Sequence, residues 1–350
     1  MVRQCLHAMC KYAVAMASVL VISVPAANQT TAPGQASATR RWVAPRTVDG
    51  RPDLQGVWDF GTLTPLERPA ALGDKQVFSD AEAAAFEREE NRRQNRDFID
   101  AARGGLNYPP GGVVPYNEFW YERGDRINAS KRTSLIVDPP DGRLPSMTAE
   151  GRKAAEIRTT AERNDQLGRP LADSYTDRTL ADRCLIGFNA GPPMTPGAYN
   201  NNVQIVQTAE QVVILNEMVH DARIVPLDGR PHLPSPLRQW KGDSRGRWDG
   251  ETLIVETTNF RRETSLRGST ANTHLVERFT RIDPDTLLYE FTVTDPATWT
   301  RPWTAAVLMK KSEGPLFEYA CHEGNYAMFN ILRGARAAEQ ASSETSAGPK

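Results

Sequence analysis

The segment TLLYEFTVT, residues 286–294, is the clearest structural signal in this chain of 350 residues. Every second residue of the segment is apolar and would share one face of an extended chain: Leu287, Tyr289, Phe291 and Val293. Aromatic and β-branched residues, which fit the pleated surface of a sheet, make up most of the segment. The segment therefore predicts a β-strand with one buried face.

Similar short segments precede and follow it, and they predict a mainly β fold. The candidates are residues 203–208, 211–219, 223–227, 252–258, 274–282, 303–310 and 316–321. Turn-forming sequences such as Asp228-Gly229 and Asp283-Pro284 connect several of them. A run of short antiparallel strands joined by tight turns is typical of a barrel or a sandwich. We expect an antiparallel barrel within a single β-rich domain, residues 47–335.

Two helices are predicted to flank the strands. Ser79 and Glu82 have the spacing of a capping box, and residues 81–103 follow without Gly or Pro until Gly104. The second helix is predicted over residues 149–167, where a thin apolar stripe ends at Gly168. The polar segment 336–350 is expected to be a disordered tail.

The start of the chain has the pattern of a secretory signal peptide. Arg3 and Lys11 precede an apolar run, residues 12–24, and Val24 and Ala26 suit signal peptidase. The run is short of the roughly 20 residues that a membrane-spanning helix needs. We expect a signal peptide over 1–26 and a flexible tether over 27–46, which places the mature protein in the periplasm or outside the cell. An uncleaved anchor is the alternative interpretation.

The composition of the mature chain argues against a nucleic-acid partner. Removing residues 1–26 leaves 40 basic and 43 acidic residues, a net charge of about −3. A nucleic-acid-binding protein would show a basic surplus. No integral membrane segment is expected after cleavage, since no further long apolar run follows.

Two cysteines remain after cleavage, and we expect them to form a disulfide. Cys184 and Cys321 are the pair, and an oxidising compartment favours the bond. A bond closing so long a loop stabilises by roughly 4–5 kcal/mol in the chain-entropy model. Two separate buried thiols are the alternative.

Several segments carry a family resemblance. They are DGRPDLQGVW (49–58), RTSLIVDPPDGRLPSMT (132–148), RCLIGFNAGPP (183–193), YNNNVQIVQT (199–208), RWDGETLIVETTNF (247–260), ERFTRIDPDTLLYEFTVTDPATWTRPW (277–303) and YACHEGNY (319–326). With them the chain resembles a family of secreted bacterial proteins of unknown function, which implies no reaction. Gly56-Val57-Trp58 is also similar to the Gly-x-Trp start of lipocalin-like barrels. This resemblance implies an antiparallel lipocalin-like barrel, with Trp58 closing one end.

Familiar signatures of enzymes and cofactor sites are absent from the sequence. There is no glycine-rich nucleotide loop, no Gly-x-Ser-x-Gly elbow and no His-Glu-x-x-His motif. We therefore expect no cofactor and no metal.

Histidines are scarce, so each is a candidate for acid–base chemistry. His220 and His322 end predicted strands, and Glu323 follows His322. An imidazole beside a carboxylate can act as a general acid or base near neutral pH. These three residues are the candidate catalytic set. The alternative is that they only form hydrogen bonds at the rim of the barrel.

Glu277 and Arg281 are candidate ligand contacts inside the barrel. The period of two places Glu277 on the same face as Leu275 and Phe279, with Arg281 two residues further on. A carboxylate in an apolar interior needs a cationic partner. The alternative is an outer face on which Glu277 is solvated.

Three functions remain open from the sequence. Trp58, Trp303 and Tyr319 could line an aromatic pocket, together with Glu277 and Arg281, for a small apolar or ring-bearing molecule. Core packing is the alternative role of these rings. The first hypothesis is thus an exported small-molecule-binding protein. The second is a secreted hydrolase or lyase, and the third is a structural or interaction protein of the envelope.

Overall fold

Residues Thr286–Thr294 form strand β9, with the alternation of buried and half-buried residues that the sequence predicts. The computed structural model describes residues 42–105, 110, 117–166, 171–264 and 266–346. The predicted signal peptide, 1–26, lies outside the described residues, as do 27–41 of the tether and 347–350 of the tail.

The fold is mainly β, as expected, and the ten strands among the described residues belong to one antiparallel sheet. Hydrogen-bonded neighbours follow the order β5-β4-β3-β1-β10-β9-β8-β7-β6, and β2 pairs with β10. The strands are β1 (Gly56–Asp59), β2 (Ile136–Asp138), β3 (Asn202–Gln207), β4 (Gln211–Asn216), β5 (Asp221–Pro226), β6 (Asp243–Asp249), β7 (Thr252–Thr258), β8 (His274–Asp283), β9 (Thr286–Thr294) and β10 (Trp303–Ser312).

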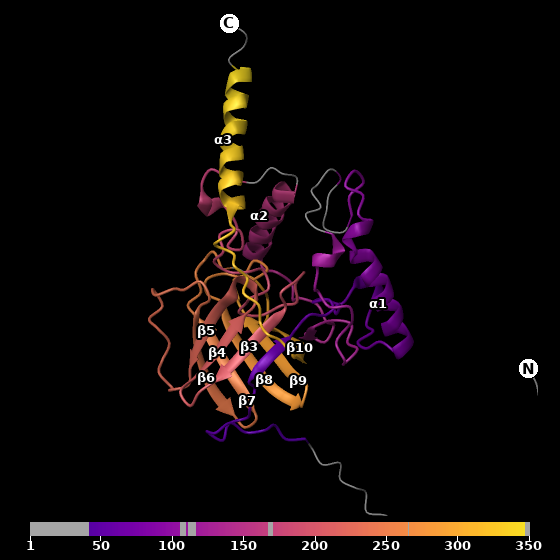
Figure 1. Cartoon of the computed structure of the whole chain (residues 1–350), viewed down its shortest axis with the longest axis vertical. Helices are drawn as coiled ribbons and strands as arrows, with labels where there is room; N and C mark the ends of the chain where they lie inside the picture. Colours follow the sequence, from indigo (N-terminus) through magenta and orange to yellow (C-terminus); the bar gives the residue numbers. More distant parts are fainter. Residues whose placement is uncertain (1–41, 106–109, 111–116, 167–170, 265, 347–350) are drawn as a thin grey trace, which may run out of the picture. The chain divides into compact units, whose positions relative to one another are not determined.

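The two ends of this path, β5 and β6, come close together without a ladder of hydrogen bonds between them in the described chain. Gly246 of β6 permits the approach. A Cβ there would lie 2.8 Å from Cγ1 of Val225 on β5 and 2.6 Å from Cδ2 of Leu227. The strands therefore curve round a common interior (Figure 1), but the hydrogen bonding does not close them into the expected barrel.

One face of the sheet packs into a single core that large side chains fill. The side chains of Trp58, Phe279, Tyr289, Phe291 and Trp303 are fully or almost fully buried. Neighbouring rings touch in tilted or edge-to-face pairs with centroids 4.9 to 5.6 Å apart. The interior at these residues is occupied by the protein's own rings.

Segment 316–321, predicted as a strand, is irregular instead. β10 already has neighbours on both sides, so no free sheet edge is left beside it. The chain leaves β10 at Ser312 and passes Gly314, whose φ of +38° turns it away. Its apolar residues are exposed or half-buried, and Phe317 is among the exposed ones.

Three α-helices lie in the described residues, one more than the sequence analysis predicts. They are α1 (Asp80–Gln94), α2 (Ala149–Gln166) and α3 (Tyr326–Ser346). The capping box of Ser79 and Glu82 starts α1 as expected. The helix ends earlier than predicted because Asn95 is extended and its side chain caps a following 3-10 turn.

The C-terminal helix α3 differs from the expected disordered tail. Its sequence contains five Ala together with Leu, Met, Arg and Glu, all of which are good helix formers. Arg336 pairs with Glu339 one turn on and donates to the carbonyl oxygens of Ala172 and Asp173, at 3.1 and 2.9 Å. Helix propensity and these anchors account for an ordered segment where polarity alone predicts a tail.

The predicted disulfide between Cys184 and Cys321 is present, with 5.7 Å between the two Cα atoms. Asn325 supports it by donating to Cys184 Sγ at 3.4 Å and to the carbonyl of Asp182 at 2.8 Å. The bond ties the segment after β10 to the loop before β3. None of the helices in the described part of the chain is long and apolar enough to cross a membrane.

Candidate functional site

A groove of about 740 Å³ opens where β5 and β6 separate. Its walls come from both strands and from the long connection between them. The lining residues are Ala222, Arg223, Ile224, Pro226, Arg230, Leu233, Arg238, Gln239, Trp240, Lys241, Gly242, Asp243, Ser244, Arg245 and Arg261.

The connection between β5 and β6 supplies much of the wall of this groove. Gln239 bridges to the end of β7, because its N–H donates to Asn259 O and its carbonyl accepts from Arg261 N, both at 2.9 Å. Next to the lining residues Pro226 and Arg245, Gly246 lets β6 approach Val225 and Leu227 closely. The groove therefore lies beside the point where the two edge strands come nearest to each other.

The lining of the groove is strongly basic. Five arginines and Lys241 border it, against the single carboxylate of Asp243. Five of these six cations have acidic partners, which are Glu277 for Arg223, Asp228 for Arg230, Asp221 for Lys241, Asp243 for Arg245 and Glu263 for Arg261. Arg238 instead donates to neutral oxygens of Phe260, Ala271 and Asn272. Among the side chains that line the groove, basic ones therefore outnumber acidic ones, and Arg238 keeps a charge that no carboxylate contacts within the described residues.

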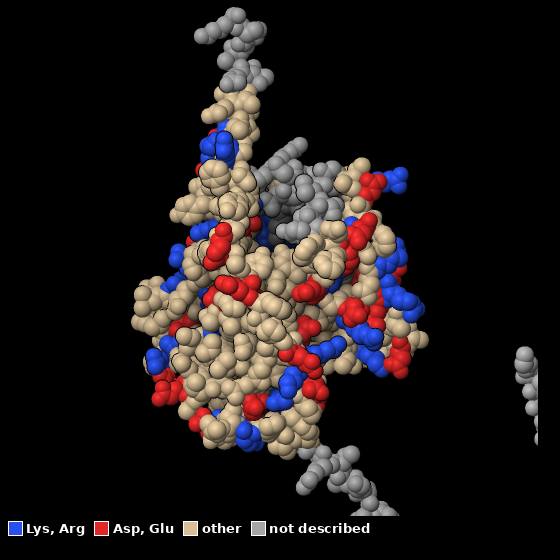
Figure 2. Space-filling model, viewed as in Figure 1, with Lys and Arg blue, Asp and Glu red and all other residues tan. Residues whose placement is uncertain are grey.

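Trp240 adds an aromatic surface beside these cations. The guanidinium carbon of Arg261 lies 4.2 Å from the centroid of its ring, and that of Arg183 lies 5.7 Å away. Cation–π contacts of this kind hold the charged groups close to the indole. On the face shown in Figure 2, by comparison, basic and acidic side chains are interspersed.

Lys241 stands at the floor of the groove with its side chain only 12% exposed. Burial has the largest influence on its ammonium group and lowers the pKa. The nearby Asp221 carboxylate acts in the opposite direction and raises the pKa. The Lys241 Nζ lies 2.6 Å from Asp221 Oδ2. A buried ammonium beside a groove adds positive potential where solvent screens little.

Arg223 forms the inner wall and reaches into the interior of the sheet. Its two Nη atoms donate to the two carboxylate oxygens of Glu277, with Nη2 at 2.9 Å from Oε1. Tyr289 Oη donates to Glu277 Oε1 at 2.8 Å and accepts from Met194 N at 3.0 Å. Burial raises the pKa of the Tyr289 phenol well above its ordinary value. The phenol therefore keeps its proton and remains a hydrogen-bond donor to Glu277.

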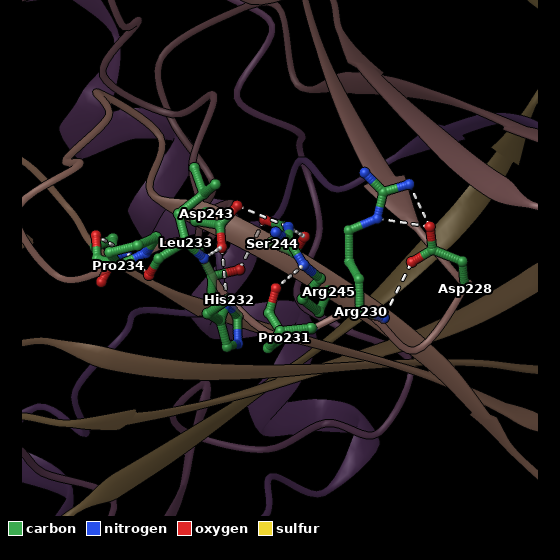
Figure 3. A network of polar contacts seen from close by, with 11 residues as sticks. Asp228, Arg230, Pro231, His232, Leu233, Pro234, Asp243, Ser244 and Arg245 are labelled. Carbon is green, nitrogen blue, oxygen red and sulfur yellow. Dashed lines mark hydrogen bonds and ion pairs between the residues drawn. The ribbon is translucent and has the colours of Figure 1, made fainter.

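A polar network fastens the connection to β6 (Figure 3). Asp243 is 4% exposed, and its carboxylate contacts His232 Nδ1 at 3.0 Å. The same carboxylate accepts from Leu233 N at 2.9 Å and from Arg245 Nη1 at 2.6 Å. These contacts hold the loop that carries Arg230 and Leu233 against the strand.

The candidate catalytic residues are all exposed and are not joined to one another. His220 follows Val219 in the turn before β5, and both have positive φ, 51° and 65°. His322 and Glu323 lie just after the disulfide. Within the described residues no hydrogen bond or ion pair links the three. Nor does that part of the chain hold a group of three or more His, Cys, Asp or Glu side chains suited to a metal ion.

The candidate ligand contacts divide between the core and the surface. Trp58 and Trp303 are fully buried, and Tyr319 is half-buried. Trp58 Nε1 donates to Leu54 O at 2.9 Å, and the Arg281 guanidinium carbon lies 5.5 Å from a Trp58 ring centroid. Glu277 has Arg223 as its partner rather than Arg281. The structure thus brings Trp58 and Arg281 together, whereas Glu277 belongs to a different set of contacts with Arg223.

A second concavity, of about 380 Å³, lies beside the end of β1. Asp59, Glu122, Asn201, Asn202, Lys310, Lys311 and Ser312 line it. Burial is the main reason why the pKa of Asp59 is raised. This second concavity is smaller than the groove between β5 and β6, and fewer basic side chains line it.

Sequence reasoning missed the groove, although a signal was present. The stretch RQWKGDSRGR, residues 238–247, places four basic residues around one Trp. Arg223 and His232 stand in no recognisable motif, because their partners lie on distant strands or loops. No known protein family, no curated protein and no solved structure matches this chain.

Proposed function

We propose that the protein is an exported binding protein for a small organic anion, and that the ligand binds in the groove between β5 and β6. The observation that carries this proposal is the surplus of basic side chains around one concavity. Its volume of about 740 Å³ lies within the range of roughly 300–1,000 Å³ that is usual for ligand pockets.

The groove also has apolar surface, which favours a ligand with a ring or hydrocarbon part. Ile224, Pro226 and Leu233 border it together with Trp240. In a typical ligand pocket, a small number of polar groups orient the ligand, and the apolar wall around them supplies most of the contact area. The apolar or ring-bearing molecule expected from the sequence fits here if it also carries an acidic group.

Export to the periplasm or the medium is part of the proposal. The leader pattern of residues 1–26 supports it. The disulfide supports it too, because such bonds persist in oxidising compartments. A lipocalin-like barrel is likewise proposed, supported by the curved sheet and by the packing of Trp58 against Arg281.

The two other functions have less support. The filled core is compatible with a structural role in the envelope. A hydrolase or lyase based on His220 and His322 would require the two imidazoles to converge on one substrate, and no hydrogen bond or ion pair in the described chain joins them. The basic groove favours binding.

A titration with the fluorescent anion anilinonaphthalene sulfonate tests the proposal. We expect saturable binding to one site on the mature protein, weakened by added salt because the contacts are charged. The uncharged analogue phenylnaphthylamine, which keeps the rings and lacks the sulfonate, should bind at least about tenfold more weakly, since a hydrogen bond to a charged group is worth about 1.5–3 kcal/mol.

Two groove variants and one control locate the site. R238Q and R261Q should each weaken sulfonate binding several-fold, whereas R278Q on the outer face of β8 should leave it unchanged. Equal affinities in all four proteins, or equal binding of the neutral analogue, would remove the support for an anion groove.

A further inference from the structure

The inner wall of the groove is the side chain of a buried arginine. Arg223 lines the groove, yet its side chain is only 7% exposed and its partner Glu277 is 0% exposed. We propose that Arg223 recognises the anionic group of the ligand, and that Glu277 and Tyr289 position its guanidinium for that contact. This inference rests on the proposed function of the groove.

Glu277 leaves Arg223 with unused hydrogen-bond donors. A guanidinium carries five N–H groups in a rigid fork. The two hydrogen bonds to Glu277 engage one donor on each Nη atom. The Arg223 side chain makes no other hydrogen bond within the described residues. Its remaining donors are available to an anion in the groove.

The positive charge of Arg223 also acts at the floor of the groove. It is one of the influences that lower the pKa of Lys241, after the larger effect of burial. Arg223 and Lys241 therefore face the same confined space. Charges in such a space interact more strongly than on an open surface, because water screens them less.

Tyr289 fixes the position of the carboxylate that holds Arg223. Its hydroxyl donates to Glu277 Oε1 and is itself held by the backbone N–H of Met194. Glu277 is thus restrained by β5, by its neighbour strand β9 and by the loop before β3. Restraint on every side keeps the guanidinium in one orientation before a ligand arrives, which lowers the entropic cost of binding.

Stability alone does not require this ion pair. Replacing a buried ion pair by apolar residues of similar volume is often neutral or stabilising, since burial of the charges costs as much as their attraction returns. A buried pair that borders a groove therefore indicates recognition. The same reasoning supplies a variant that removes the charges and keeps the fold.

The double variant R223M/E277Q is that test. It removes both charges together, and its carboxamide still accepts from Tyr289. We expect it to fold, with an unfolding midpoint near that of the wild type, and to bind anilinonaphthalene sulfonate at least about tenfold more weakly. Wild-type affinity in the folded double variant would overturn the proposal.

The single variant E277Q gives a result of opposite sign. The carboxamide oxygen can still accept from Arg223 and hold the guanidinium in place, but the negative charge is gone. The groove therefore becomes more positive, and the sulfonate should bind more tightly than to the wild type. A purely structural role of Glu277 predicts equal or weaker binding instead. If E277Q does not fold, the double variant decides alone.

The controls separate this inference from the proposed function. R278M, on the outer face of β8, should bind the sulfonate as the wild type does. If R238Q and R261Q weaken sulfonate binding while R223M/E277Q does not, the groove binds anions but Arg223 does not contact the anionic group. If the wild type binds no sulfonate, the proposed function fails first.

Discussion

Arg223 and Glu277 form a bidentate ion pair inside the sheet, although their strands, β5 and β8, share no ladder of hydrogen bonds. β6 and β7 lie between the two strands on one side, where the groove interrupts the sheet. The ion pair therefore links edge strand β5 to β8 through the interior, on the side where β5 and β6 share no backbone hydrogen-bond ladder.

Removing one partner of this pair should destabilise the protein strongly. R223M leaves the Glu277 carboxylate buried without its cation, which typically costs about 3–5 kcal/mol. Urea unfolding followed by tryptophan fluorescence measures this loss. R223M/E277Q should recover most of it, because both charges are gone. A single variant as stable as the wild type would show that water or another cation replaces Arg223.

The sequence predicts those features that depend on neighbours along the chain. The alternation of residues 286–294 gives strand β9, and the Ser79–Glu82 spacing gives the start of α1. The disulfide follows from the two cysteines that lie outside the predicted signal peptide. Each of these signals lies in a short stretch or in a simple count.

The missed features depend on contacts between distant segments. Arg281 shares a strand face with Glu277, but it lies four residues further along the strand and contacts Trp58 and Asp53 instead. The true partner, Arg223, is 54 residues away on another strand. The groove arises because the two ends of the sheet path diverge, and no local pattern encodes that.

The stability of the protein should depend on the ionisation of Asp59. Its folded-state pKa is raised above the ordinary 3.8, mainly by burial. The stability that it contributes is present below pH 3.8 and is lost as the pH rises through the raised pKa. At neutral pH the ionised carboxylate therefore opposes folding.

The variant D59N tests this sign, since its carboxamide oxygen can still accept from Gly61 N, which is 2.7 Å from the carboxylate. We expect D59N to be at least as stable as the wild type at neutral pH and to lose that advantage in acid. Urea unfolding at both pH values gives the comparison. Lower stability of D59N at neutral pH would contradict the assignment.

Loss of the disulfide should loosen the C-terminal segment more than the sheet. C184S/C321S removes a bond that spans 137 residues of sequence, which typically costs about 2–5 kcal/mol. Hydrogen exchange should become faster in α3, whose other anchors include Asn325 and Arg336. Strand β9 should stay protected under native conditions. Equal protection of α3 with and without the bond would refute this.

The most direct test of the anion groove is the indole N–H spectrum of nitrogen-labelled tryptophan during a titration with anilinonaphthalene sulfonate. Trp240 borders the groove, whereas Trp58 and Trp303 are fully buried in the core. We predict that the Trp240 signal, assigned with W240F, shifts progressively and saturates, while the Trp58 and Trp303 signals stay in place. Shifts of the core tryptophans with an unmoved Trp240 would contradict a groove site and would place the ligand inside the sheet.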